Sequence, residues 1–229
     1  MPNVMPDKKT AYITADGTNL DLFRFVADKE GDLSAGQLFA LKWVQTSDKD
    51  GGAATVEWID LGHADDASVW AAVEKGIKFS DLFEVADFNA DGSCPEGFTG
   101  SNADGHLECL KVKPGMDMLA SRLETTRYAS IKGASTEFRK MEGSTYNPDK
   151  NSLYVAMSEV SKGMTDAEVL AAAEYFAALK PKRIIKVVES ETIPKTGPSR
   201  LFYVKSPEGG TEPLGQRIVE MPDDVDQFE

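Results

Sequence analysis

The sequence predicts a mainly β protein with α-helical insertions, and three observations lead to this fold class. Short runs rich in β-branched and aromatic residues recur along the chain, turn signals such as Asp-Gly separate them, and few segments carry apolar residues at helical spacing. The segments expected to be strands are 10–14, 21–26, 38–43, 54–61, 136–142, 152–157, 183–189 and 200–204.

Three segments are expected to be helical. Residues 65–76 place Val69, Trp70 and Val73 at helical spacing, and residues 114–131 begin with a proline in the first turn. Residues 165–179 open with a Thr-x-x-Glu capping box. Between the first two helices, residues 87–106 are rich in Asp, Asn, Gly and Ser, and we expect them to form a long irregular loop.

A short sequence motif occurs twice in the first 160 residues, and we call it the internal echo. A Pro-Asp-Lys turn followed by a hydroxyl residue, an apolar residue, Tyr and a β-branched residue occurs at 6–13 and again at 148–155. The two copies lie 142 residues apart. Propeller blades repeat every ~40–50 residues, so this spacing corresponds to three blades and favours a partial β-propeller arc.

Composition bounds the function class. The chain has 229 residues and a formal net charge of −13, which argues against a nucleic-acid interface and is compatible with binding of hard cations. No apolar run is long enough for a membrane span, and the first residues show no signal-peptide pattern. The two cysteines, Cys94 and Cys109, fit either a disulfide or two buried thiols.

A cation and a carboxylate stand two residues apart near the end of the expected strand 136–142. Alternation along a strand would point Phe138, Lys140 and Glu142 to one face. An ammonium beside a carboxylate suits a site that holds a metal ion and an anion such as phosphate. The competing interpretation is an ordinary surface ion pair on a solvated face.

Two further segments carry candidate metal ligands. Asp87, Asn89 and Asp91 alternate and precede Gly92, which is how calcium-binding loops begin. An EF-hand would need Glu at the twelfth position, where the chain has Phe98, so the choice lies between a looser calcium loop and an Asx-rich turn. Asp16 follows a strand, which suits either a metal ligand or a hairpin turn.

Several of these segments resemble the PhoX-like alkaline phosphatase family. The resemblance covers about residues 1–163 and is carried by residues 5–19 (MPDKKTAYITADGTN), 32–36 (DLSAG), 58–64 (WIDLGHA), 118–129 (MLASRLETTRYA) and 133–143 (GASTEFRKMEG). It implies a secreted or periplasmic β-propeller that hydrolyses phosphate monoesters with calcium and iron.

The resemblance also assigns roles to two residues. It implies that Glu142 is a metal ligand and that Lys140 contacts phosphate, at a position where many relatives have Arg. A bidentate contact would thereby become a point-charge contact. Other ligands of the family site, the export signal and the first part of the propeller would precede residue 1, so we expect little or no activity from this chain alone.

Residues 164–229 depart from that family and are expected to form a small α+β tail. Residues 165–181 and 212–220 resemble the carboxy-terminal part of a bacterial class I cytochrome c. Haem attachment needs Cys-x-x-Cys-His, and neither cysteine has that spacing, so no haem is expected. Two alternatives to the phosphatase stay open, a non-catalytic calcium-binding β-domain and a haem-free remnant of an electron-transfer protein. An open propeller arc would also leave sheet edges that favour self-association.

Overall fold

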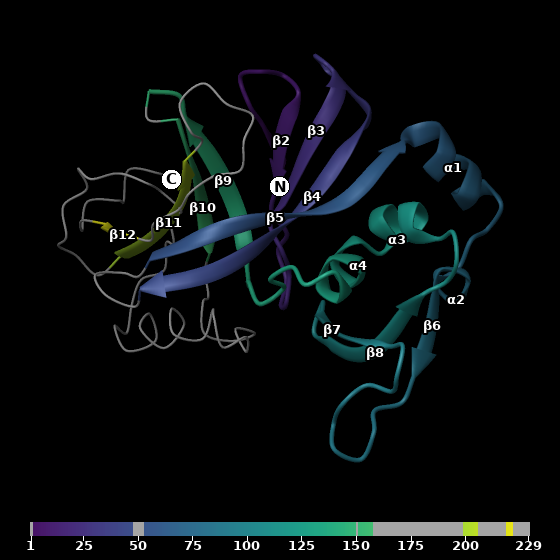
Figure 1. Cartoon of the computed structure of the whole chain (residues 1–229). Helices are drawn as coiled ribbons and strands as arrows, with labels where there is room; N and C mark the ends of the chain where they lie inside the picture. Colours follow the sequence, from purple (N-terminus) through teal and green to yellow (C-terminus); the bar gives the residue numbers. More distant parts are fainter. Residues whose placement is uncertain (1, 48–52, 150, 158–198, 206–218, 222–229) are drawn as a thin grey trace.

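The protein is mainly β, as the sequence predicts, and the strands of its described residues form antiparallel sheets of five, four and three strands; several of these strands are labelled in Figure 1. The computed structural model describes residues 2–47, 53–149, 151–157, 199–205 and 219–221. The expected helix at 165–179 and the expected strand at 183–189 lie outside the described residues. The strand expected at 200–204 is confirmed as part of β11 (Ser199–Lys205).

The five-stranded sheet is a meander in which each strand pairs with its neighbours in the chain. The sheet consists of β1 (Pro2–Val4), β2 (Thr10–Ile13), β3 (Phe23–Lys29), β4 (Asp32–Ser47) and β5 (Ala53–Asp65). The four strands predicted at 10–14, 21–26, 38–43 and 54–61 are all present in it. Strands β4 and β5 are the longest, and shifts in their register, for example between Gln37 and Phe39, mark irregularities in the ladder.

Helix α1 (Asp66–Glu74) continues directly from β5. Asp65 caps it, because its carboxylate accepts the backbone N–H of Ser68 at 2.9 Å and so satisfies one of the free amides of the first turn. The predicted helix at 65–76 is therefore confirmed. A short second helix, α2 (Phe79–Leu82), leads into the next sheet.

The three-stranded sheet corrects one prediction. Residues 99–106 do not belong to an irregular loop, because β7 (Thr99–Ala103) and β8 (His106–Val112) form a hairpin, and β6 (Phe83–Ala86) pairs with β8. Asp104 and Gly105 connect the hairpin with φ angles of 52° and 77°. An Asp-Gly pair with two positive φ angles is a favoured two-residue hairpin connection, and this local signal outweighs the polar composition.

The predicted helix at 114–131 is two helices, α3 (Asp117–Leu123) and α4 (Thr125–Ile131). They are separated at Glu124, whose φ and ψ of −132° and 50° lie outside the helical region. Pro114 precedes α3 rather than standing in its first turn. The break lets the two short helices lie between the five-stranded and three-stranded sheets (Figure 1).

One core joins these layers. Apolar side chains of the five-stranded sheet, including Phe23 and Leu61, pack with Leu110 of β8 and with Tyr128 and Ala129 of α4. All are less than a tenth exposed. Burial of such side chains stabilises the fold by roughly 1.5–3 kcal/mol each, so the helices and both sheets depend on one another.

The four-stranded sheet contains β9 (Met141–Asn147), β10 (Ser152–Met157), β11 and β12 (Val219–Met221), in the order β12-β11-β10-β9. The predicted strand at 152–157 is confirmed. Both copies of the internal echo occupy turns between antiparallel strands, the first between β1 and β2 and the second between β9 and β10. In the first copy, the Asp7 carboxylate accepts the N–H groups of Lys9 and Thr10.

Candidate functional site

The segment from Thr136 to Met141 departs from the predicted strand. Strand β9 begins only at Met141, and Lys140 has a φ of 55° in the left-handed region. Phe138, Lys140 and Glu142 therefore do not share one face of a regular strand, since the alternation is broken at the lysine. In the earlier part of the segment, Phe138 forms an isolated bridge with Leu20, which lies in the loop between β2 and β3.

Backbone hydrogen bonds fix this segment against the loop between β2 and β3. Leu20 N–H donates to the Phe138 carbonyl at 2.9 Å, and Phe138 N–H donates to the Leu20 carbonyl at 3.1 Å. Lys140 N–H donates to the carbonyl of Gly17 at 2.8 Å. We call residues 14–21 together with 136–142 the junction, because two segments more than a hundred residues apart meet there.

The junction brings together two residues that the sequence singled out separately. The Lys140 ammonium lies 2.9 Å from an Asp16 carboxylate oxygen, and the two side chains are 38% and 55% exposed. An ion pair of this exposure contributes at most about 1 kcal/mol to folding. The pair is therefore open to solvent and to a solute, and it is not a strong structural clamp.

Glu142 is exposed at the beginning of β9. Its backbone N–H donates to the Lys140 carbonyl at 3.0 Å, so a tight turn separates the predicted metal ligand from the predicted phosphate contact. Asp16, Lys140 and Glu142 thus belong to one region of the molecule. The geometry supplies two carboxylates and one ammonium, which can bind a hard cation and an anion respectively.

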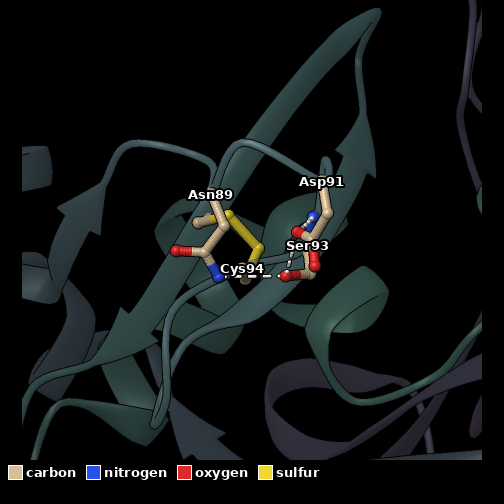
Figure 2. Close-up of a disulfide and its surroundings, with 5 residues drawn as sticks. Asn89, Asp91, Ser93 and Cys94 are labelled. Carbon is tan, nitrogen blue, oxygen red and sulfur yellow. Dashed lines mark hydrogen bonds between the residues drawn. A yellow bond between two sulfur atoms is a disulfide. The ribbon is translucent and has the colours of Figure 1, made fainter.

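Asp87, Asn89 and Asp91 belong to the loop between β6 and β7, on the three-stranded sheet. The Ser93 backbone N–H and hydroxyl both donate to Asp91, at 2.9 and 2.6 Å, and these bonds lower the pKa of the carboxyl group. The Asn89 side-chain amide donates to the Ser93 hydroxyl (Figure 2). The loop geometry is thus that of an Asx-type turn whose oxygens bind within the loop.

A disulfide joins Cys94 to Cys109 and anchors this loop to β8 (Figure 2). The two Cα atoms are 5.5 Å apart, and Cys109 is fully buried. The sequence left a disulfide and two free thiols as equal alternatives, and the structure selects the disulfide.

The predicted metal ligands fall into two separate groups, Asp16 with Glu142 and the three residues of the 87–91 loop. Within the described residues, no three His, Cys, Asp or Glu side chains converge into a metal-binding group. A metal ion at either place would need ligands beyond those residues, because calcium takes about 6–8 oxygen ligands.

Sequence reasoning missed a buried acidic group inside the junction. Asp21 is 0% exposed and Glu137 is 7% exposed, and the Leu20–Phe138 bridge sets them beside one another. The Leu22 N–H donates to one Asp21 oxygen at 2.6 Å, while the other oxygen has no hydrogen-bond partner among the residues that the structure describes. Burial, and then the charge of Glu137, raise the pKa of Asp21 well above its usual range. No local pattern signals this pair, since only the bridge brings it together.

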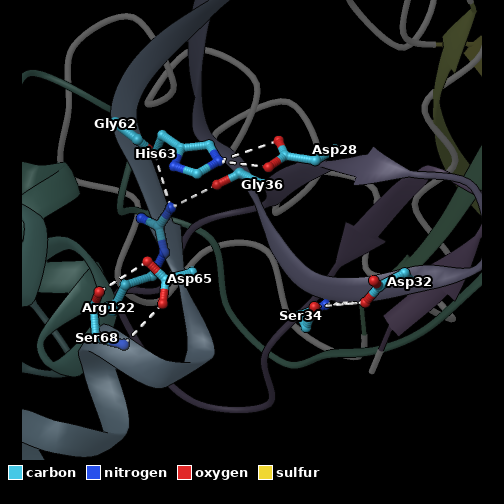
Figure 3. Close-up of polar contacts among 9 residues, drawn as sticks. All are labelled: Asp28, Asp32, Ser34, Gly36, Gly62, His63, Asp65, Ser68 and Arg122. Carbon is cyan, nitrogen blue, oxygen red and sulfur yellow. Dashed lines mark hydrogen bonds and ion pairs between the residues drawn. The ribbon is translucent and has the colours of Figure 1, made fainter.

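Two further motifs of the family resemblance, 32–36 and 58–64, meet at the far end of the β4–β5 ladder, where Gly36 pairs with Ala64. Arg122 of α3 donates to the carbonyls of Gly36 and Gly62 at 3.2 and 2.8 Å (Figure 3). Nearby, His63 lies 3.0 Å from Asp28. Arg122 thus attaches α3 to the sheet and the His63–Asp28 pair links β5 to β3, so the role of these residues here is structural.

Comparison with known proteins identifies no significant similarity to this chain. No family model matches the chain, and neither the curated proteins nor the solved structures contain a significant match. Among the described residues, no helix combines the length and hydrophobicity that a membrane crossing requires.

Proposed function

We propose that the junction is part of a metal-dependent site for hydrolysis of phosphate monoesters of the PhoX type, and that the described residues hold this site incompletely. One observation carries the proposal. Asp16 and Lys140, which the sequence singled out for separate reasons, lie 2.9 Å apart although 124 residues separate them in the chain.

Lys140 is the proposed phosphate-binding residue. Its ammonium has three donors, and one of them faces Asp16. The remaining donors can bind phosphate oxygens while the ion pair with Asp16 keeps the side chain in place. Its left-handed backbone turns the chain at this residue, which sets the side chain apart from the regular face of β9.

Glu142 and Asp16 are the proposed metal ligands. Carboxylate oxygens suit calcium, whereas iron rests on the family resemblance alone. When bound, the metals would neutralise charge on the phosphate oxygens during displacement. Two carboxylates supply at most four oxygens, and within the described residues no third acidic or histidine side chain joins them, so we expect weak metal binding and low activity.

The remaining features of the proposal concern architecture and location. The meander has the nearest-neighbour strand order of a propeller blade, with five strands where a blade has four, and this order is the support for a partial propeller arc. The Cys94–Cys109 disulfide supports a periplasmic or extracellular location, because disulfides persist in oxidising compartments. The terminal strands of an incomplete arc would also permit self-association through their edges.

A calcium-binding β-domain without catalysis is the second candidate. It would use Asp87, Asn89 and Asp91, which are all exposed on a loop that the disulfide constrains. The hydrogen bonds from Ser93 place it second, because calcium would have to compete with them for the Asp91 carboxylate. The haem-free electron-transfer remnant depends on the tail at 164–229, most of which lies outside the described residues.

Hydrolysis of 4-nitrophenyl phosphate tests the first candidate. Turnover is measured for the wild type with calcium, with iron, with both and with a chelator, and for Glu142→Ala and Lys140→Gly. Glycine is chosen at 140 because it adopts the positive φ without strain. Glu96→Gln, an exposed change on the β6–β7 loop, is the matched control.

We expect slow, metal-dependent turnover in the wild type and the control, and its loss in both junction variants. Turnover that survives Glu142→Ala would place the chemistry elsewhere. If no metal condition gives turnover, calorimetric titration decides between the remaining candidates. Calcium binding that is lost on Asp91→Asn and retained in Glu142→Ala would favour the calcium-binding domain.

A further inference from the structure

A groove separate from the junction runs between the β3–β4 hairpin and helix α1. It has a volume of about 560 Å³, within the ~300–1,000 Å³ range of small-molecule sites. Its apolar lining comes from β2, β3 and β4, with Ile13, Phe25 and Leu38, and from Ala64 of β5. The groove is open to solvent, so a ligand can enter without a change in the fold.

Two exposed apolar side chains flank the groove. Trp70 of α1 is 63% exposed and Leu33 of the β3–β4 hairpin is 49% exposed, and both contribute to its lining. The Trp70 indole N–H donates to Glu74 at 3.0 Å, one helical turn away, which restrains the ring. None of the nine residues of α1 is fully buried, so this helix leaves its apolar side chains available to a ligand.

The charge available in the groove is negative. Three charged side chains line it, Asp65, Asp66 and Arg122. The guanidinium of Arg122 already donates to three acceptors, the carbonyls of Gly36 and Gly62 and the hydroxyl of Ser121. These donors are thus used within the protein, and the two carboxylates against one guanidinium leave the lining with a net negative charge.

Of the two carboxylates, Asp65 already accepts the backbone N–H and the hydroxyl of Ser68 as the cap of α1, so Asp66 is the one available to bind a ligand directly. Hydrogen bonds from Ser68, first from its backbone N–H and then from its hydroxyl, lower the pKa of Asp65, so this carboxylate stays ionised at neutral pH. Asp66 is exposed, and no ion pair involves it within the described part of the chain. The net charge of −13 adds a long-range attraction for cations.

We propose that this groove binds a small amphipathic amine. Its apolar or aromatic body would lie on the floor formed by Phe25 and Leu38, and its ammonium would lie at the rim near Asp66. The exposed indole of Trp70 would add a cation–π contact, since a cation within about 6 Å of a Trp ring is attracted by the negative face of the ring. This binding activity is independent of phosphate hydrolysis.

Three matched probes test the proposal on the full chain. They are 4-phenylbutylamine, 4-phenylbutanol and 4-phenylbutyrate, which share an apolar body and differ in charge. Binding is measured by calorimetry and by the NMR shift of the Trp70 indole N–H, which Trp70→Phe identifies among the three tryptophans. We expect the amine to bind about tenfold more tightly than the alcohol, and the butyrate to bind most weakly.

Two variants separate the charge from the apolar surface. Asp66→Asn should reduce the preference for the amine over the alcohol severalfold, while Trp70→Ala should weaken both probes. Both positions are exposed, so the melting temperature should stay near that of the wild type, and Glu96→Gln is the charge-matched control. Equal affinities for the three probes, a preference for the butyrate, or no binding at millimolar concentrations would overturn the proposal.

Discussion

The carboxyl group of Asp21 is fully buried beside that of Glu137, at the point where Leu20, in the loop between β2 and β3, forms an isolated bridge with Phe138 in the segment before β9. Two neighbouring carboxylates in a low-dielectric site do not both ionise easily. Protonation of Asp21 therefore favours the folded junction, because its raised pKa makes the folded state bind this proton more tightly than the unfolded state does.

This arrangement predicts a pH-dependent stability. Burial first, and then the charge of Glu137, raise the pKa of Asp21 in the folded protein, whereas the unfolded value is about 4. The folded state thus holds the proton more tightly. Stability from this group is fully present below pH ~4 and falls as the pH rises toward the folded pKa.

Asp21→Asn removes that dependence. We compare the free energies of urea-induced unfolding of the wild type and the variant at several pH values between 5 and 8, about the range in which other acidic groups are already ionised. The difference between them should move in favour of the variant as the pH rises. Asp66→Asn, an exposed change, should show no such trend, and a parallel pH profile for Asp21→Asn and the wild type would contradict a buried proton.

Two substitutions at Lys140 separate the effect of its left-handed backbone from the effect of its side-chain ion pair. A non-glycine residue in the left-handed region lowers the unfolding free energy by roughly 1 kcal/mol. The exposed ion pair with Asp16 raises it by at most about that amount. Lys140→Gly should therefore leave the unfolding free energy nearly unchanged. Lys140→Val, whose β-branched side chain disfavours positive φ, should unfold at lower urea concentration. Equal stability of the two variants would contradict the left-handed conformation.

Arg122 fastens α3 to the β4–β5 ladder through two backbone carbonyls. Arg122→Ala leaves these half-buried acceptors without that donor, and we expect a loss of about 2–3 kcal/mol in unfolding free energy. Arg122→Lys should recover only part of the loss, because an ammonium lacks the planar fork of a guanidinium. Lys75→Ala, an exposed change after α1, is the control, and the measurement is chemical denaturation.

Gly36 has no room for a side chain. A Cβ atom there would lie 2.4 Å from the Val26 carbonyl oxygen and 2.6 Å from the ring of Phe25. Gly36→Ala should therefore destabilise the protein by about 1–3 kcal/mol, as overpacked sites do. Gly143→Ala is the matched control, because its Cβ would meet nothing within 4 Å. Similar melting temperatures for the two variants would show that the hairpin adjusts.

The Cys94–Cys109 disulfide should stabilise the chain by roughly 3 kcal/mol, the value expected for a 15-residue loop. A reducing agent should lower the melting temperature of the wild type. The Cys94→Ser/Cys109→Ser double variant should melt lower from the outset and should not respond to the reductant. A wild type that melts at one temperature with and without reductant would contradict this contribution.

The sequence by itself determined the elements whose signals are local. The strands of the five-stranded sheet follow from β-branched and aromatic runs, and α1 follows from apolar residues at helical spacing. The hairpin between β7 and β8 also has a local signal, the Asp104-Gly105 turn, although the polar composition of 87–106 predicts an irregular loop.

Only the tertiary structure decided which distant residues meet. The Asp16–Lys140 contact, the Asp21–Glu137 pair and the stacking of Arg24 on the rings of Phe39 and Trp58 all depend on packing between separate segments. A periodic pattern fixes the face on which a side chain lies, but it carries no information about the segment that will cover this face. The break of alternation at Lys140 likewise arises from the hydrogen bond to Gly17, which belongs to the other end of the described chain.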